Sequence, residues 1–471
     1  MTVPVGEIAG EITVVVGAAV IVVVVLFVDR RRQWLGAPLA LATCACAGTL
    51  ISVRLASTPQ KLTWDGAWSL DHAAGWAELV ILAATSITVA FSPEWFATDA
   101  RHGEWYAVLL LSAAGAMTMA GAADSLELVL GVLLSSTTGY VLAAYHRRSA
   151  LSVEAGAKYF LVGALTNVLL LAGVAVLFGA AGTTVYSGTA TSLTGSSTVT
   201  LTAAAVLITV GLAFKLGAFP AHTWVPDVVQ GAPAPAAAFL TVAPKIGALV
   251  GLARIVSLLP DSAVGWRPLV AVVAALTMTV GNLSAIWQND VRRLLGWSSV
   301  SQAGYALMAI PVLGRSPQAL PALLFFVTAY AAAQMAAFGV VVELRGRTAL
   351  DDYRGLAGRR PWLAAMLIVA LLSFVGVPPL AGFGGKLLLF TAAIDGGYSW
   401  LAVVAVVNTV VSLFYYLRVV APIALDGARG PVPVLGRWAS VGTAASAAAV
   451  VGLGLGAQPI LHAAVNARLL P

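Results

Sequence analysis

The sequence predicts an all-α polytopic membrane protein with about 14 transmembrane helices. Of its 471 residues, 60% are hydrophobic and only 10% are charged, which excludes a soluble globular domain. Apolar runs of about 20 residues, the length that an α-helix needs to cross a bilayer, recur along the whole chain. The segments between these runs are short. The simplest interpretation is a single membrane domain over residues 1–471.

The predicted spans are centred near residues 20, 45, 82, 113, 135, 168, 209, 247, 277, 302, 330, 371, 411 and 446. The first apolar run, 12–28, shows no cleavage site before a soluble body, so we expect a retained helix and no signal peptide. The second span contains Cys44 and Cys46. Small packing residues are the favoured interpretation of this C-x-C pattern, and no metal site is expected.

The longer connections are 54–71, 182–198 and 343–361, and basic residues are distributed unequally between the two sides. Loops after odd-numbered spans hold seventeen Lys and Arg residues, and the opposite loops hold five. Because basic loops stay inside, we expect 343–361 to be cytoplasmic and both termini to be outside. The net charge of +6 therefore reflects orientation in the lipid bilayer, and no nucleic acid is expected as a partner.

Three lysines, Lys215, Lys245 and Lys386, lie within predicted spans. A lysine at the bilayer centre costs about 2.5–3.5 kcal/mol. One such lysine could extend its ammonium to the interface. Three together favour a different interpretation, because desolvated lysines can gain and release protons, and ionisable groups inside a membrane are typical of proton relays.

Prolines and glycines interrupt two of the spans that carry these lysines. Pro220 follows Lys215, whereas Pro378 and Pro379 precede Lys386. A single proline could simply kink a helix. Two interrupted spans at corresponding places indicate two halves related by an internal repeat, with a polar path at mid-membrane depth. Lys245 lies thirty residues after Lys215, which suits two antiparallel helices with both lysines at similar depth.

The lysines occur in stretches that resemble the antiporter-like proton-channel subunits of respiratory complex I, the proton-pumping NADH–quinone oxidoreductase. The stretches are "FKLGAFPAHTWVPDVVQGAPAPAAAFLTVAPKIGALVGLARI" (214–255), "GNLSAIWQNDVRRLLGWSSVSQAGYALMAI" (281–310), "LSFVGVPPLAGFGGKLLLF" (372–390) and "SVEAGAKYFLVGAL" (152–165). The pattern from "PDVVQGAPAP" to "APK" is similar to subunit N rather than to subunits L and M. The resemblance is specific from about residue 104 to 420.

The resemblance implies a fold in which helices 4–8 and 9–13 are inverted five-helix repeats and helices 7 and 12 are discontinuous. The corresponding division places helices 1–3 in 1–103, the first repeat in 104–259, the second in 266–422 and a C-terminal helix in 436–457. It also implies roles for the lysines. Lys215 would be the central lysine of helix 7, Lys245 its relay partner on helix 8, and Lys386 the outlet lysine of helix 12.

The implied activity is proton translocation coupled to electron transfer from NADH to quinone, as a subunit of a translocase. No cofactor motif is present in this chain, so FMN, iron–sulfur clusters and quinone would belong to partner subunits. The implied partners are homologous L- and M-type subunits and small membrane subunits.

The chain departs from the family pattern at two positions. Leu133 stands where the family usually has a glutamate on helix 5, and neither Glu127 nor Glu154 is an obvious substitute for it. Gln302 stands where a histidine is common, and it can support a water chain without changing charge. His222 follows the break of helix 7 and is a candidate for proton uptake from the cytoplasm, with an ordinary helix-end histidine as the equal alternative.

Two other functions remain open at this point. A cation/proton antiporter subunit would need a carboxylate at mid-span, and the sequence shows none clearly placed there. A structural membrane-arm subunit that has lost pumping is favoured by Leu133.

Overall fold

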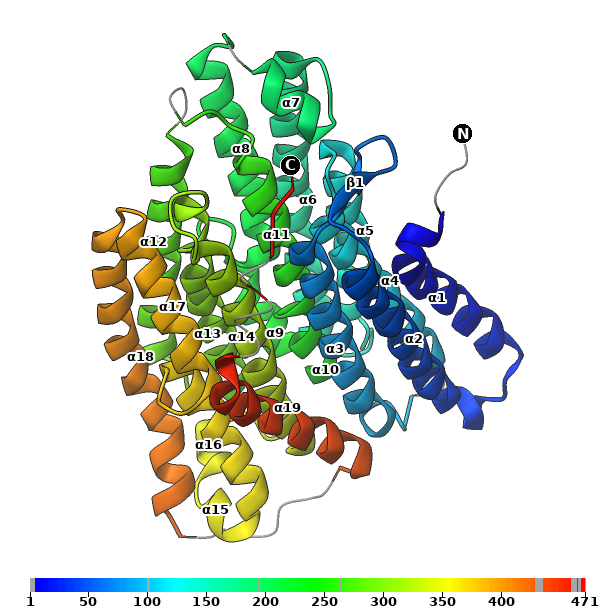
Figure 1. Ribbon diagram of the computed structural model, residues 1–471. Helices are drawn as coiled ribbons and strands as arrows, with labels where there is room; N and C mark the ends of the chain where they lie inside the picture. Colours follow the sequence, from blue (N-terminus) through cyan, green and yellow to red (C-terminus); the bar gives the residue numbers. More distant parts are fainter. Residues whose placement is uncertain are drawn as a thin grey trace.

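The computed structural model describes residues 5–99, 102–193, 195–261, 265–427, 435–458, 464 and 467–470. These residues form a bundle of helices with one small hairpin (Figure 1). The longer helices are α1 (Ala9–Phe27), α2 (Gly36–Ser57), α3 (His72–Trp95), α4 (Gly103–Gly121), α5 (Ser125–Ala143), α6 (Ala150–Ala181), α8 (Thr198–Leu216), α11 (Ala243–Val256), α12 (Trp266–Ile286), α13 (Val291–Leu307), α14 (Ala319–Glu343), α16 (Pro361–Val375), α17 (Ala381–Asp395), α18 (Ser399–Leu425) and α19 (Arg437–Leu455). The shorter elements are η1 (Val5–Ile8), η2 (Arg30–Leu35), α7 (Tyr186–Ser192), α9 (Trp224–Gly231), α10 (Ala234–Leu240), η3 (Ile310–Val312), η4 (Leu350–Tyr353) and α15 (Leu356–Arg359).

The predicted polytopic all-α fold is confirmed, since a helix covers each predicted centre. Eleven helices of the described residues are long and apolar enough to cross a membrane. The helices α4, α13 and α16 cover the remaining centres. Burial differs between spans. In the most apolar 18-residue stretch of 234–256, 100% of the residues are buried, whereas in that of 30–57, which contains α2, only 22% are buried. The 234–256 segment therefore lies at the centre of the bundle, whereas much of the surface of α2 is not covered by other helices.

The two predicted helix breaks have the same local cause. Helix α8 ends at Gly217 (φ 63°) and α16 ends at Gly376 (φ 92°), both in the left-handed conformation. Glycine adopts this conformation without the clash that a Cβ causes. The prolines beyond each glycine cannot continue the helical hydrogen bonds. The chain resumes as α9 in the first case and as α17 in the second.

A third break was not predicted from the sequence. The segment 234–256 is divided into α10 and α11 at Thr241 and Val242. Val242 has φ −120° and ψ −70°, outside the helical range. Lys245 lies in the first turn of α11, directly after this break.

Both ends of the described chain lie at one end of the bundle, which we call the outer end. It carries the antiparallel hairpin β1 (Lys61–Thr63) and β2 (Trp68–Leu70), which the all-helical prediction did not include. Lys61 forms an ion pair with Glu7 near the N-terminus, and the Leu470 N–H near the C-terminus donates to Asp71 at 2.9 Å. Residues 182–198 with α7 lie at this end, whereas α15, within 343–361, lies at the opposite end (Figure 1).

A buried ion pair connects several elements at the outer end. Arg254 of α11 donates to Asp71, the N-cap of α3, at 2.6 Å, and both side chains are 0% exposed. Arg254 also donates to Ser69 of β2, to the Ala120 carbonyl of α4 and to the Leu470 carbonyl. We call this group the Arg254 clamp.

Candidate proton path

Lys215 is buried in the last turn of α8, immediately before the break (1% exposed). Its Nζ donates to the Ser135 hydroxyl of α5 at 3.3 Å. The ammonium also lies 5.8 Å from the ring centre of Tyr159 and 5.5 Å from that of Phe214. Aromatic faces and hydroxyl groups stabilise a cation without neutralising it. Among the described residues, the partners of this lysine are therefore uncharged.

Lys245 lies on α11, which packs against α8. Its Nζ donates to the carbonyl and the hydroxyl of Ser299 of α13, at 2.6 and 2.7 Å. The ring of Tyr330 lies 5.4 Å away, and its hydroxyl donates to Ser299 Oγ at 3.0 Å. The side chain of Lys245 is buried. It thus lies on a helix that contacts the helix of Lys215.

Lys386 lies in the second half of the other broken span, on α17, and is buried. Its Nζ donates to the Val375 carbonyl, freed at the end of α16, at 3.2 Å and to Thr409 of α18 at 3.4 Å. The ammonium is 4.2 Å from the ring centre of Tyr305. The helix break thus supplies a direct hydrogen-bond acceptor to this lysine.

None of the three lysines lies within ion-pair distance of a carboxylate in the described part of the chain, where the lysine ion pairs belong to Lys61 and Lys158.

Helix α13 carries polar side chains that extend from Lys245 to Lys386. Ser299 contacts Lys245, Gln302 donates to the Phe374 carbonyl at 3.4 Å, and Tyr305 contacts Lys386. Positions three apart share one face of a helix, and the six residues from Ser299 to Tyr305 span about 9 Å. We call Ser299, Gln302 and Tyr305 the α13 stripe. Gln302 was a candidate from the sequence, but Ser299 and Tyr305 were missed, although their spacing in "SSVSQAGY" was visible.

His222 lies in the break between α8 and α9 and faces α13. Its ring is stacked with Phe219 at 5.8 Å and lies 5.7 Å from the ring of Trp297. Its Nδ1 is buried and has no hydrogen-bond partner among the described residues. The histidine thus lies beside Trp297, which precedes the polar residues of α13. Its Nδ1 is available to a water molecule.

The two glutamate candidates from the sequence, Glu154 and Glu127, lie apart from the three buried lysines. Glu154 is exposed on α6 and forms an ion pair with Lys158 at 2.7 Å. Lys158 also contacts Asp227 of α9 at 2.7 Å, and Arg293 donates to the same carboxylate at 2.6 Å. Glu127 lies in the first turn of α5, eight residues or about 12 Å before Ser135. Neither glutamate forms an ion pair with Lys215 among the described contacts.

The described fold and lysine sites match a known family. Residues 122–412 match the model of the NADH:quinone oxidoreductase/Mrp antiporter transmembrane family. The chain belongs to this family. The match contains all three buried lysines and all three breaks described above.

The resemblance to subunit N is confirmed within this family. NADH-quinone oxidoreductase subunit N of Mycobacterium sp. (strain JLS) is 48% identical over 397 residues, which cover 84% of each chain. Subunit N 1 of Streptomyces griseus subsp. griseus is 42% identical over 457 residues, which cover 96% of each chain.

Two solved structures share the fold. A chain in respiratory complex I from Thermus thermophilus with bound aureothin has a TM-score of 0.83 and 29% identity, over 97% of this chain and 99% of that chain. A chain in the Mrp complex from Dietzia sp. DQ12-45-1b has a TM-score of 0.82 at 23% identity, over 98% of this chain and 96% of that chain. The second likeness concerns the fold alone.

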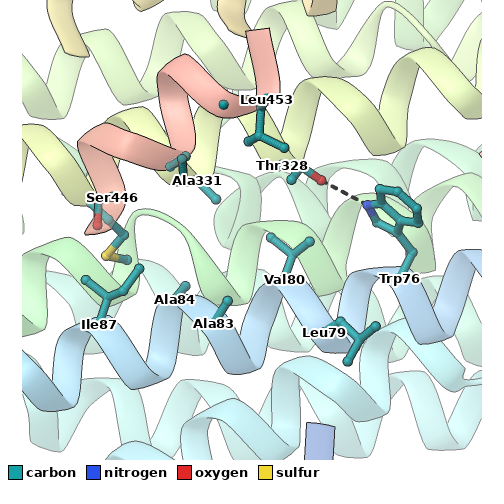
Figure 2. Close-up of a pocket in the computed structure, with 14 residues that line it drawn as sticks. Trp76, Leu79, Val80, Ala83, Ala84, Ile87, Thr328, Ala331, Ser446 and Leu453 are labelled. Atoms are coloured by element: carbon teal, nitrogen blue, oxygen red, sulfur yellow. Dashed lines mark hydrogen bonds between the residues drawn. The ribbon is translucent and has the colours of Figure 1, made fainter. Parts of the chain in front are cut away.

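A large apolar cavity of about 540 Å³ lies apart from the lysines, between α3, α14 and α19. Figure 2 shows aliphatic side chains such as Val80, Ile87 and Leu453 lining it, while the Trp76 indole donates to Thr328 at 2.9 Å. No ionisable residue lines this cavity. It therefore contributes no proton-carrying group to the path.

Proposed function

We propose that this chain is an N-type membrane-arm subunit of a proton-translocating NADH–quinone oxidoreductase. The observation that carries the proposal is the row of three buried lysines, each held by uncharged partners, in a chain 48% identical to a subunit N. A lysine held this way can release its proton to a neighbour or to water, because no carboxylate fixes its charge.

The proposed path runs along the lysine row. Lys215 holds the central proton, Lys245 receives it, and the α13 stripe leads to Lys386 and the outer side. His222 supplies protons from the cytoplasmic side. Electron transfer takes place in partner subunits, which hold FMN, iron–sulfur clusters and quinone, and the neighbours in the membrane are L- and M-type subunits and small membrane subunits.

Two inverted five-helix repeats, 104–259 and 266–422, are part of this proposal. The two glycine-terminated breaks support it, because each first half-helix ends at a left-handed glycine followed by proline. The outer end with both termini is proposed to face outwards, and 343–361 the cytoplasm.

Substitution of the lysines in the intact complex tests the proposal. Lys215→Ala and Lys386→Ala are expected to remove most NADH-driven proton pumping in membrane vesicles while the complex stays assembled. Lys215→Arg is expected to pump poorly as well, because arginine keeps its proton, with a pKa above about 12. Lys61→Ala, outside the membrane, is the control and is expected to pump normally.

The outcomes separate the alternatives. Normal pumping by both Lys215→Ala and Lys215→Arg would leave a structural subunit. Co-purification with NADH-oxidising subunits is expected. A chain isolated without them, with sodium-dependent proton exchange, would favour a cation/proton antiporter.

A further inference from the structure

Three ionisable side chains from three helices, two of them buried and one largely buried, meet near the outer end, away from the three buried lysines. Arg54, in the last turn of α2, lies between Glu11 of α1 and Glu78 of α3. It donates to Glu11 Oε1 at 2.7 Å and to Glu78 Oε2 at 2.5 Å. The side chains of Arg54, Glu11 and Glu78 are 11%, 9% and 0% exposed. The sequence had placed Arg54 among the loop cations, and neither glutamate was identified from it.

Close helix packing holds this group together. A Cβ on Gly10, next to Glu11, would lie 2.6 Å from Ile51 of α2. A Cβ on Gly75 of α3, three residues before Glu78, would lie 2.6 Å from Leu55, which is also on α2. Since a larger residue would push the helices apart, both glycines allow the close approach of α1 and α3 to α2.

The charges of the group do not balance without another positive charge. Arg54 is the only cation that forms an ion pair with either glutamate in the described part of the chain. The second oxygens, Glu11 Oε2 and Glu78 Oε1, are buried and have no hydrogen-bond partner there. Both carboxyl groups contact the same guanidinium, so they lie close to each other. Two carboxylates cannot hydrogen-bond to each other unless one carries a proton.

We propose that Glu11 and Glu78 form a proton-binding site that holds one proton between them and exchanges it with the aqueous phase at the outer end. One proton makes the group neutral: two carboxyl groups, one shared proton and one guanidinium. Like charges in one buried site cannot both persist, so the pair binds its proton as a unit.

A cavity beside the group provides the route for exchange. It has a volume of about 270 Å³ and is lined by Arg54 together with Glu7, Ser57 and Thr58. Aliphatic residues such as Leu50, Val53 and Leu70 form the rest of its lining. The polar side chains on one part of the cavity can hold water molecules, and the volume is large enough for several.

The other ionisable groups near the outer ends of the packed elements include Glu7, Lys61, Asp65, Asp71, His72, Arg254 and the exposed Arg468, whose backbone N–H donates to Gln60. Lys61 pairs with Glu7, and Arg254 pairs with Asp71. The charged residues of α4, α14 and α19 lie at the opposite ends of those helices. No lysine of the proposed row is an ion-pair partner of Glu11 or Glu78 in the described structure. The site is therefore independent of the proton path proposed above.

Infrared spectroscopy of the purified complex that contains this chain tests the site. The unmodified complex is expected to show, at neutral pH, a C=O stretch of a protonated carboxyl group that shifts in heavy water. Glu11→Gln and Glu78→Gln are each expected to abolish it, because the remaining carboxylate then forms a one-to-one ion pair with Arg54. Glu104→Gln, an exposed glutamate on α4, is the matched control and is expected to keep the band.

The outcomes are distinct from those of the pumping assay. Lys215→Ala is expected to keep the carboxyl band even if pumping is lost. A band that survives either Gln substitution overturns the shared-proton site. Labelling of the unmodified complex with dicyclohexylcarbodiimide, which reacts with protonated buried carboxyl groups, requires no variant. Peptide mapping is expected to find the adduct on Glu11 or Glu78 at neutral pH, and its absence from both residues also overturns the proposal.

Discussion

At the residue scale, Lys215 depends on a hydroxyl where the family usually supplies a carboxylate. The resemblance predicts that a partner on helix 5 would stand at Leu133. The structure instead places Ser135 against the ammonium, and Leu133, partly buried among hydrophobic residues, lies about 200° further round α5. A hydroxyl can accept a hydrogen bond from the charged or from the neutral form of a lysine. A carboxylate favours the charged form more strongly, because the two form an ion pair.

A carboxylate at Ser135 is therefore expected to hold the proton on Lys215. Ser135→Asp should slow coupled proton pumping about tenfold, because an ion-pair stabilisation of about 1.4 kcal/mol changes an equilibrium by that factor. Ser135→Asn has the same shape without the charge and is expected to pump within about twofold of the unmodified complex. Equal rates for the Asp and Asn variants would show that Ser135 does not control Lys215. Leu133→Glu should have a smaller effect than Ser135→Asp, since its side chain starts from another face of α5.

At the element scale, α13 connects two lysines that lie on different helices. Its glycines allow this position: a Cβ on Gly304 would lie 2.5 Å from the Met278 nitrogen of α12, so only glycine permits this approach. The α13 stripe faces Lys245 at one end and Lys386 at the other. The helix thus places uncharged hydrogen-bonding groups between the two lysines.

Two serines on α13 provide a matched test of this role. Ser299 accepts hydrogen bonds from Lys245 and Tyr330, whereas the Ser301 hydroxyl is buried without a partner among the described residues. Ser299→Ala removes both hydrogen bonds, although Tyr330 keeps its bond to the Thr241 carbonyl. Loss of the Lys245 bond alone, worth about 0.5–1.5 kcal/mol, should reduce coupled pumping about 2- to 10-fold. Ser301→Ala should leave the rate unchanged. Vesicle pumping assays compare the two, and a loss in Ser301→Ala as large as that in Ser299→Ala would contradict the role of the stripe.

At the scale of the whole molecule, the Arg254 clamp joins α3, α4, α11 and the hairpin to the C-terminal residues. Burial alone would raise the pKa of the Asp71 carboxyl group. The Arg254 guanidinium and the N–H groups of Ala74 and Leu470 outweigh burial, so the pKa lies below its ordinary value. A carboxyl group with a lowered pKa stabilises the fold above its unfolded pKa of about 3.9. That contribution is lost as the pH falls through the folded value.

Removal of one partner should leave the other charge buried and unpaired. Asp71→Asn is expected to lower the free energy of unfolding by about 3–5 kcal/mol at neutral pH. It should also remove part of the acid sensitivity below about pH 4. Thermal melting of the detergent-extracted complex over a pH series measures both effects. Asp65→Asn, exposed in the same outer segment, is the control, and an equal loss in this variant would contradict the clamp.

The orientation of the molecule can be measured directly in intact cells. After Cys44 and Cys46 are replaced by alanine, Ser187→Cys is expected to react with a membrane-impermeant thiol reagent added outside, and Ala349→Cys is not. Both positions are exposed in the described structure. The expectation follows from the excess of basic residues in the loops on the side of 343–361. The reverse labelling pattern would invert the proposed orientation.

The sequence by itself determined the spans, the two breaks at Gly217 and Gly376 and the three lysines, but not the third break at Thr241 and Val242. A bilayer demands apolar runs of about 20 residues, glycine and proline interrupt them for local backbone reasons, and a lysine in such a run is visible without any structure. These features depend on neighbouring residues in the chain, so they could be predicted from it.

Only the tertiary structure decided which groups face the lysines and which charges meet. Ser135 lies 80 residues from Lys215, and Asp71 lies 183 residues from Arg254. In a soluble helix, polar and apolar faces would indicate such contacts. In this protein both the lipid-facing and the protein-facing sides are apolar, so the helical period carries little information about orientation. The partners of Lys215 and Lys245, the Arg254 clamp and the group of Arg54 with Glu11 and Glu78 follow from how the helices pack, because each contact joins residues that are distant in the sequence.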